Sequence, residues 1–285
     1  MAKYRKILVA YDGSSSARNA LTVAARMARE SKSWIKVLAV APPYEGDLEL
    51  IGVRNIKETI LGPGQKLLTE AQAIADHEDV HILKNLEQGE PYDRIVHVAE
   101  DENCDLIVMG RRGVTHVERE FIGSVTARVI GHTNRDVLVV PENAALEIDN
   151  ILVAVDGSKY SKNAVDHAIN LAAENKAELT ALHVVYTNDE YFTIAHEAIN
   201  TLVDEAKHML ADIVNNAGTQ DVTVNTRVRE GEPHEAILAE AAERKANPIV
   251  MGSHGRKGMA RLLMGSVTER VIGFARCPVL IVHGQ

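Results

Sequence analysis

The chain has 285 residues, of which 46% are hydrophobic and 25% charged, a composition typical of globular proteins with room for two domains. Its 40 acidic and 31 basic residues give a formal charge of −9, which disfavours binding to nucleic acid or an anionic membrane surface. The first apolar run is too short for a signal sequence, and no run approaches the ~18 apolar residues of a membrane span. We therefore expect a cytoplasmic protein.

Short apolar runs alternate with helical patterns through the first half of the chain. Continuous apolar runs are typical of parallel strands covered on both faces. The predicted strands are Ile7–Tyr11, Val37–Ala41, Val80–Leu86, Asp105–Met109 and Val137–Val140. A helix is predicted between the first two strands, with Ser14 or Ser15 placed to cap it. Its helically spaced apolar residues are Ala17, Ala20, Leu21, Ala24 and Ala28.

The second half repeats the first. ILVAYDGS at Ile7–Ser14 returns as ILVAVDGS at Ile151–Ser158, and GSVTARVIG at Gly123–Gly131 returns as GSVTERVIG at Gly265–Gly273. Between them, QGEP at Gln88–Pro91 matches EGEP at Glu230–Pro233, and IVMG ends at Gly110 and again at Gly252. The constant order indicates duplication of a whole domain. We expect domains at 1–144 and 145–285, with a linker near Pro141–Asp149.

Two helices of the second half are also predicted from apolar spacing. The helix after the first strand contains Ala164, Ala168 and Leu171. The helix after the second strand has an apolar stripe at Ile194, Ala198, Leu202, Ala206, Leu210 and Ile213. Each half is therefore predicted to be an α/β domain with a doubly wound, five-stranded parallel sheet. Such sheets bind ligands at the carboxyl ends of the strands, where the winding direction reverses.

A glycine motif follows the fourth strand of each copy. The first copy reads Gly110-Arg111-Arg112-Gly113, nine residues, then Gly123-Ser124; the second reads Gly252-Ser253-His254-Gly255, nine residues, then Gly265-Ser266. Glycines let backbone amides approach a phosphate, and a helix N-terminus favours an anion. Ser124 and Ser266 are expected to donate to a phosphate and to cap their helices. The alternative is that the glycines only end strands, but the identical spacing favours a ligand.

Asp12 and its counterpart Asp156 end the first strand of each copy. A carboxylate would repel a phosphate, so we expect each to face a ribose hydroxyl or an adenine amino group. The alternative is that each caps the following helix. Neither the Rossmann nor the Walker glycine pattern follows the first strand, which disfavours those two nucleotide-binding folds.

The glycine motif, the aspartate and a last strand that begins CPVL at Cys277 resemble the tandem form of the universal stress protein family, over essentially the whole chain. The resemblance implies that family's fold, which is like that of the adenine nucleotide alpha-hydrolases, and binding of ATP, with AMP or ADP as alternatives and Mg²⁺ as a companion of a triphosphate. It implies adenine near Val40 or Val184, ribose near the aspartate and phosphates on the glycine loop. The expected binding residues are Asp12, Val40, Met109, Gly110, Arg112, Gly113, Gly123, Ser124, Val125, Asp156, Val184, Met251, Gly252, His254, Gly255, Gly265, Ser266 and Val267.

The resemblance also implies pairing of domains through their last strands. Within one chain this would place Val137–Pro141 beside Val279–His283. A homodimer and an unidentified regulatory protein partner are further expectations. The function implied is a stress-response regulator that acts through nucleotide-dependent conformation or partner binding.

The two glycine loops differ in charge. The second carries Arg256, Lys257 and Arg261, which are able to face a triphosphate. The first carries Glu118 and Glu120, which flank Arg119 and weaken its positive potential, and Arg135-Asp136 replaces Cys277-Pro278. We expect both sites to bind, with the second site tighter.

Other functions have weaker support in the sequence. His254 has Arg112 as its counterpart and no evident orienting group, so a catalytic role is disfavoured. No His/Cys/Asp cluster repeats at metal-ligand spacing, although His77 and His81 leave zinc as an alternative. The HIGH-like signature of adenylyltransferases is missing after the first strand. Slow ATP hydrolysis and a nucleotide-free interaction scaffold remain alternatives. Cys104 and Cys277 are expected to be reduced core thiols.

Overall fold

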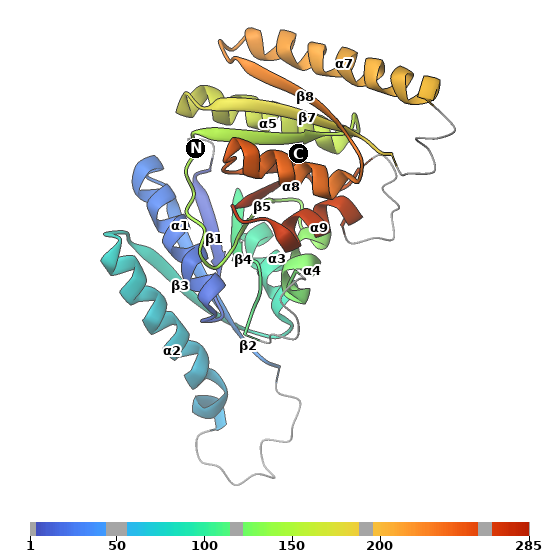
Figure 1. The fold of residues 1–285 in the computed structure, drawn as a ribbon. Coiled ribbons are helices and arrows are strands. Elements are labelled where there is room, and N and C mark those ends of the chain that lie inside the picture. The colour runs from blue at the N-terminus through green and yellow to red at the C-terminus, as the bar shows by residue number, and fades with distance from the viewer. Residues whose placement is uncertain (1–3, 44–55, 115–121, 188–195, 256–263, 285) are drawn as a thin grey trace. The chain divides into compact units, whose positions relative to one another are not determined.

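A computed structural model of the chain describes residues 4–43, 56–114, 122–187, 196–255 and 264–284 (Figure 1). The chain divides into two compact units, Ala2–Asn143 and Ala144–Gln285, called here the first and second unit. No helix within the described ranges is both long and apolar enough to cross a membrane.

The first unit is a parallel sheet with helices between its strands. The strand order is β3-β2-β1-β4-β5, and each neighbouring pair is parallel. In chain order its elements are β1 (Lys6–Ala10), α1 (Ser15–Ser31), β2 (Trp34–Ala41), α2 (Ile56–His77), β3 (Ile82–Gln88), α3 (Pro91–Asp101), β4 (Leu106–Gly110), α4 (Ser124–His132) and β5 (Asp136–Val140).

The second unit repeats this plan, with parallel strands in the order β8-β7-β6-β9-β10. Its elements are β6 (Asn150–Val155), α5 (Lys159–Asn175), β7 (Glu178–Val185), α7 (His196–Gly218), β8 (Val224–Glu230), α8 (Pro233–Arg244), β9 (Ile249–Gly252), α9 (Ser266–Phe274) and β10 (Val279–Val282). The predicted fold class, two tandem doubly wound five-stranded parallel sheets, is confirmed.

Helices cover the sheet of the first unit in two pairs. Helices α1 and α2 pack on each other, as do α3 and α4 (Figure 1). Because the chain reverses its winding direction after β3, right-handed crossovers place the two pairs on opposite faces. Strands β4 and β5 are consequently buried along their whole length. The reversal falls between β1 and β4, and in the second unit between β6 and β9.

The first helix of each unit begins at a serine cap. The Ser14 hydroxyl accepts from the Ala17 amide at 3.1 Å, and the Ser158 hydroxyl accepts from the Ser161 amide at 3.1 Å, so Ser14 rather than Ser15 is the cap. The apolar faces predicted for these two helices are confirmed by the burial of Ala17, Ala20, Leu21, Ala24, Ala28, Ala164, Ala168 and Leu171.

Several details of the predicted elements were wrong. Strand β1 ends at Ala10 rather than at Tyr11, strand β2 begins at Trp34 rather than at Val37, and strand β4 runs Leu106–Gly110 rather than Asp105–Met109. Strand β3 begins at Ile82 rather than Val80, because Asp79 takes a left-handed φ of 57° and the Val80 amide closes the end of α2 on the Ala75 carbonyl at 3.0 Å. On α7, Leu202 is 44% exposed, and the buried stripe instead runs through Ile199 to Ala206, Leu210 and Ile213. Ile194 and the side chain of Ala198 lie outside the described residues.

Both cysteines are free thiols. Cys104 is buried, as predicted, whereas Cys277 is partly exposed. Burial raises the pKa of the Cys104 thiol, and it raises that of Cys277 to about 11. Neither thiol is therefore expected to be reactive near neutral pH.

Candidate functional site

Each unit contains a cavity at the carboxyl ends of its strands, where the winding reverses. The cavity of the first unit has a volume of about 780 Å³ and that of the second about 420 Å³. Both volumes fall in the range of about 300–1,000 Å³ that is usual for small-molecule sites. A cavity at this point of a doubly wound sheet is the common location of a ligand site.

Every residue predicted to bind the ligand lines one of these cavities. The first cavity contains Asp12, Val40, Met109, Gly110, Arg112, Gly113, Gly123, Ser124 and Val125. The second contains Asp156, Val184, Met251, Gly252, His254, Gly255, Gly265, Ser266 and Val267. Residues more than 100 positions apart in the sequence therefore meet in one place, because parallel strands bring their carboxyl ends to the same edge of the sheet.

The aspartate at the end of the first strand is held by backbone amides. Asp12 Oδ1 accepts from the Ser14 amide at 3.0 Å, and its Oδ2 accepts from the Val114 amide at 3.2 Å. Asp156 Oδ1 accepts from the Ser158 amide at 2.9 Å. The alternative that these aspartates cap the following helices is wrong, because the caps are Ser14 and Ser158. Each carboxylate instead stands in the cavity wall in a fixed orientation.

The glycines of the loop are required partly by contacts within the protein. A Cβ at Gly110 would lie 2.6 Å from the Ser16 hydroxyl, and one at Gly252 would lie 2.8 Å from Tyr160. Those glycines let the first helix pack closely on the strand end. A Cβ at Gly113 or Gly255 would lie 2.6 or 2.7 Å from the carboxylate of Asp12 or Asp156. Any side chain there would displace the aspartate.

The loop closes on itself and then enters a helix. The Gly123 amide donates to the Arg111 carbonyl at 2.9 Å, and the Gly265 amide donates to the Ser253 carbonyl at 2.9 Å. Gly123 and Gly265 are the N-caps of α4 and α9 and offer no side-chain cap. The prediction that Ser124 and Ser266 cap these helices was therefore wrong, since they are the first helical residues. The amides of each first turn have no acceptor within the helix and can bind an anion.

Several apolar residues of the cavity walls were not predicted. The clearest are Pro91 and Ile95 in the first unit and Pro233 and Ile237 in the second. The QGEP and EGEP repeats contained this signal, because they end at Pro91 and Pro233, where α3 and α8 begin. The positive φ of Gly89 and Gly231, 142° and 118°, belongs to the turns that aim these helices at the cavities.

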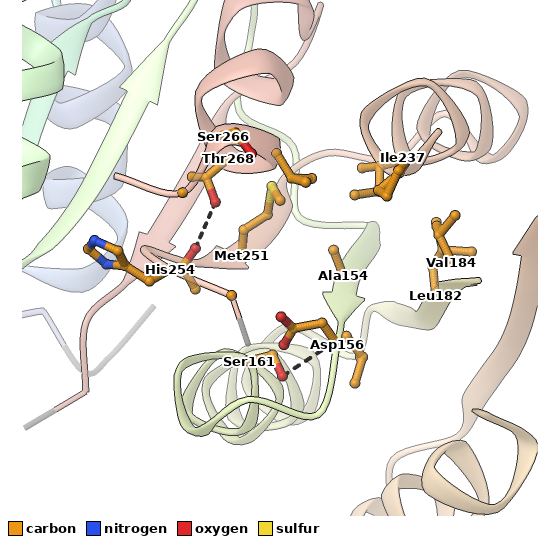
Figure 2. A pocket seen from close by; sticks show the side chains of 16 residues that line it. Ala154, Asp156, Ser161, Leu182, Val184, Ile237, Met251, His254, Ser266 and Thr268 are labelled. Atoms are coloured by element: carbon orange, nitrogen blue, oxygen red, sulfur yellow. Dashed lines mark hydrogen bonds between the residues drawn. The ribbon is translucent and has the colours of Figure 1, made fainter. Parts of the chain in front are cut away.

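Figure 2 shows how the second cavity is arranged. Asp156 faces the cavity from one side, with Ser266 and Thr268 across from it, while Leu182, Val184 and Ile237 form an apolar wall (Figure 2). The Thr268 hydroxyl is used within the protein, since it donates to the Gly252 carbonyl at 3.0 Å. The arrangement offers an apolar end for a planar group and a polar end for charged oxygens.

The two sites differ in the charge at the glycine loop. His254 lies at the edge of the second cavity (Figure 2). Its Nδ1 is 3.2 Å from the Ser253 hydroxyl, and its ring centroid is 5.3 Å from that of Tyr160. The first loop has Arg111 and Arg112 at these positions. Burial, with the adjacent Arg112, lowers the pKa of Arg111. The charged residues Glu118, Arg119, Glu120, Arg256, Lys257 and Arg261 lie outside the described residues.

The described residues of the two cavities form no preformed metal cage. Among the described residues, no group of three or more His, Cys, Asp and Glu side chains could hold a metal ion. The Nδ1 of His77, one of the two histidines considered for zinc, lies 3.9 Å from Glu78 Oε1. This pair is not part of a group of three such side chains among the described residues.

The fold and the site together define a tandem pair of doubly wound α/β domains. Each domain has a cavity of the size of a small-molecule site where the winding direction of its sheet reverses. The model of the universal stress protein family matches the chain twice, at residues 3–141 and 147–283. The chain belongs to the universal stress protein family, and the predicted resemblance is confirmed.

Several curated universal stress proteins match the chain, and two of them match about half of it. The chain is similar to universal stress protein MJ0531 of Methanocaldococcus jannaschii, with 40% identity over 136 residues, which cover 46% of this chain and 80% of that protein. It is also similar to universal stress protein YxiE of Bacillus subtilis, with 36% identity over 146 residues, 47% of this chain and 99% of that protein.

A solved structure matches the whole chain. The crystal structure of a universal stress protein from Archaeoglobus fulgidus aligns with a TM-score of 0.75 over 99% of this chain and 100% of that chain. At 22% sequence identity, this similarity supports the fold alone.

Proposed function

We propose that each unit binds one adenine nucleotide, with ATP as the ligand, and that the protein is a stress-response regulator whose conformation or partner binding depends on that nucleotide. The observation that carries the proposal is the convergence of nine predicted residues of each copy on one cavity. A glycine loop used only to end a strand would not require the aspartate, the apolar wall and the helix N-terminus to meet.

Each part of the cavity suits one part of the nucleotide. The apolar wall of Leu38 and Val40, or of Leu182 and Val184, suits the adenine ring. A fixed carboxylate suits the ribose hydroxyls, which can donate to it. The first-turn amides of α4 or α9 suit the phosphates, because they combine unpaired N–H groups with the positive end of the helix.

We propose that any Mg²⁺ is held mainly by the nucleotide phosphates and water. Mg²⁺ usually keeps several waters and takes only one or two carboxylates from a protein. The lack of a carboxylate cage among the described residues is compatible with this arrangement.

The proposal is tested by the nucleotide content of the purified protein. The protein is purified without added nucleotide and denatured, and the released molecules are identified by mass spectrometry and counted by absorbance near 260 nm. With a single tryptophan in the chain, bound adenine adds clearly to the spectrum. Release of ATP supports the proposal, and release of AMP or ADP would correct the ligand. A protein that releases no nucleotide and takes up none from ATP and Mg²⁺ would contradict it.

Two matched substitutions separate the sites. Ser124 and Ser266 are exposed at the first position of α4 and α9, where a glutamate favours the helix while its charge repels a phosphate. Ser124→Glu should therefore remove binding at the first site and Ser266→Glu at the second, with both helices intact. Circular dichroism and thermal unfolding check that the variants are folded.

A further inference from the structure

We propose that the first unit holds a further binding site, for a small aromatic carboxylate, in a cavity at the amino ends of strands β1, β2 and β3. The nucleotide cavities lie at the carboxyl ends of the strands, so this site is separate from them. Trp34 and Val40 mark the two cavities on β2 and are about 20 Å apart along the strand. The inference does not depend on the proposed function.

The cavity lies between the sheet and the segment after α3, where Cys104 is buried. It has a volume of about 330 Å³, within the range of small-molecule sites. Lys6 pairs with Trp34 across β1 and β2, and Lys36 pairs with Leu83 across β2 and β3. Paired residues, and alternate residues of one strand, point to the same face of a sheet. These four side chains therefore line the cavity from one face.

Two large apolar side chains stand exposed at this cavity. Trp34 is 68% exposed and Leu83 is 51% exposed. The fold does not require apolar residues at these positions, since the same strands of the second unit carry Glu178 and Asn225 there. Exposed apolar side chains that gather at a cavity are typical of a binding site. A ligand that covers them removes their apolar surface from water.

The charges at the cavity favour an anion. Lys36 Nζ donates to Glu102 Oε1 at 2.5 Å, and Lys6 Nζ donates to the Glu102 carbonyl at 2.9 Å. The described lining therefore has two ammonium groups and one carboxylate. The nearby Asp105 carboxylate accepts instead from the amides of Arg5 and Lys6, at 2.8 and 2.9 Å. Because an ammonium has three donors, both lysines can also donate to a carboxylate of the ligand.

These features together specify the class of ligand. An aromatic ring packs well on the Trp34 indole, an alkyl group suits Leu83, and a carboxylate suits the two lysines. The second unit lacks this set of side chains, since Thr180 replaces Lys36 and Arg244 replaces Glu102.

The test uses Trp34, the only tryptophan of the chain, whose fluorescence reports on this cavity directly. The probe is 4-butylbenzoate, and the comparison ligand is 4-butylbenzyl alcohol, which has the same ring and chain but no charge. We expect the acid to shift the Trp34 emission to shorter wavelength in a saturable way, with a dissociation constant of about 0.1–1 mM, as is usual for a ligand of this size. The alcohol should bind about threefold more weakly, as for the loss of one exposed ion pair.

Two substitutions test the assigned contacts. Leu83→Asn and Lys36→Thr each introduce the residue that the second unit has at that position, so the strands should be preserved, and thermal unfolding checks that they are. Leu83→Asn should weaken the binding of both ligands about fivefold, because it removes apolar surface. Lys36→Thr should remove most of the preference for the acid. The control is Leu202→Asn on α7, a similarly exposed leucine, which should change neither ligand's affinity.

The same titration in the presence of ATP separates this site from the nucleotide cavities. The Trp34 shift should be unchanged by ATP, and the nucleotide content of Leu83→Asn should equal that of the unmodified chain. Absence of a saturable shift, full affinity in Leu83→Asn, equal binding of acid and alcohol, or loss of the shift on adding ATP would each overturn the inference and leave the proposed function in place. Absence of bound nucleotide together with the expected Trp34 shift would overturn the proposed function and leave this site.

Discussion

The cavity walls of the two units are alike, but the buried charges that support the surrounding helices are not. In the first unit, Glu78 at the end of α2 accepts from Arg26 on α1, with Nη2 to Oε1 at 3.0 Å. In the second unit, Glu240 on α8 accepts from Arg229 on β8 at 2.5 Å and from Arg244 at 3.0 Å.

These two buried carboxylates occupy unrelated positions. The counterpart of Glu240 is the buried Val98, and the counterpart of Glu78 is the exposed Gln220. The strand ends and the glycine contacts therefore constrain the cavity wall in the same way in both units. Away from the cavity, the two units use different residues to stabilise their helices. Changes at the supporting residues should alter the stability of one unit and leave the cavity of the other unaffected.

The largest effect is expected from exchanging the residue at the α3 and α8 position. Val98→Glu places a carboxylate at the position of Glu240 in the first unit. The counterparts of Arg229 and Arg244 there are Glu87 and Glu102, so the new carboxylate has no arginine beside it from these positions. An unpaired buried charge should lower the free energy of unfolding of the first unit by about 3–5 kcal/mol. Glu240→Val should lower the free energy of unfolding of the second unit less, by about 1–3 kcal/mol. Arg229 and Arg244 lose their carboxylate partner, but both are about a third exposed and can be solvated by water. Urea unfolding measures both, and a cost under about 1 kcal/mol for Val98→Glu would contradict the account.

A symmetric effect is expected at the glycines beneath the first helix. Gly110→Ala and Gly252→Ala should each lower the free energy of unfolding of their unit by about 1–3 kcal/mol, because the new Cβ overpacks the contact with α1 or α5. Gly218→Ala at the end of α7 is the control for the second unit. A Cβ there meets nothing within 4 Å, so the substitution should not lower the free energy of unfolding of that unit and should raise it by at most about 0.5–1 kcal/mol. Equal effects at Gly218 and Gly252 would show that the close contact is unimportant.

Acid should destabilise both units through different residues. Hydrogen bonding from Arg26 lowers the pKa of Glu78; at Glu240 burial acts in the opposite direction, but hydrogen bonds from Arg229 and Arg244 outweigh it and lower the pKa. Each carboxylate therefore contributes stability that is present above the unfolded pKa of about 4.3 and is lost as pH falls through the lower folded value. The midpoint temperature of thermal unfolding should fall less steeply between pH 6 and pH 3 in Glu78→Gln and in Glu240→Gln than in the unmodified chain. Unchanged profiles in both would exclude these residues as the cause.

The smallest expected effect is the difference in ATP affinity between the sites. The basic residues of the second loop predict that Ser124→Glu, which leaves the second site, binds ATP a few-fold more tightly than Ser266→Glu. This ordering remains a prediction, as does pairing of the units through their last strands. Calorimetry on both variants measures the ordering, and equal affinities would count against it.

The sequence was sufficient to predict much of the fold and which residues line the two cavities; that these residues bind a ligand stays a prediction. Asp12 and Gly110 could be placed together because both follow strands, and parallel strands share one edge. The residues contributed by α3, such as Ile95, could not be assigned, because helix aim depends on turns such as the one at Gly89. The capping roles of Ser124 and Ser266 were wrong because a serine after a glycine gives no indication of which of the two is the cap.

The most direct test of two independent sites is a count of bound nucleotide by equilibrium dialysis with ATP and Mg²⁺, after removal of any nucleotide that was purified with the protein. The account predicts about two equivalents for the unmodified chain, about one for Ser124→Glu and for Ser266→Glu, and none for the double variant. Two equivalents in a folded double variant, or none in the unmodified chain, would contradict it.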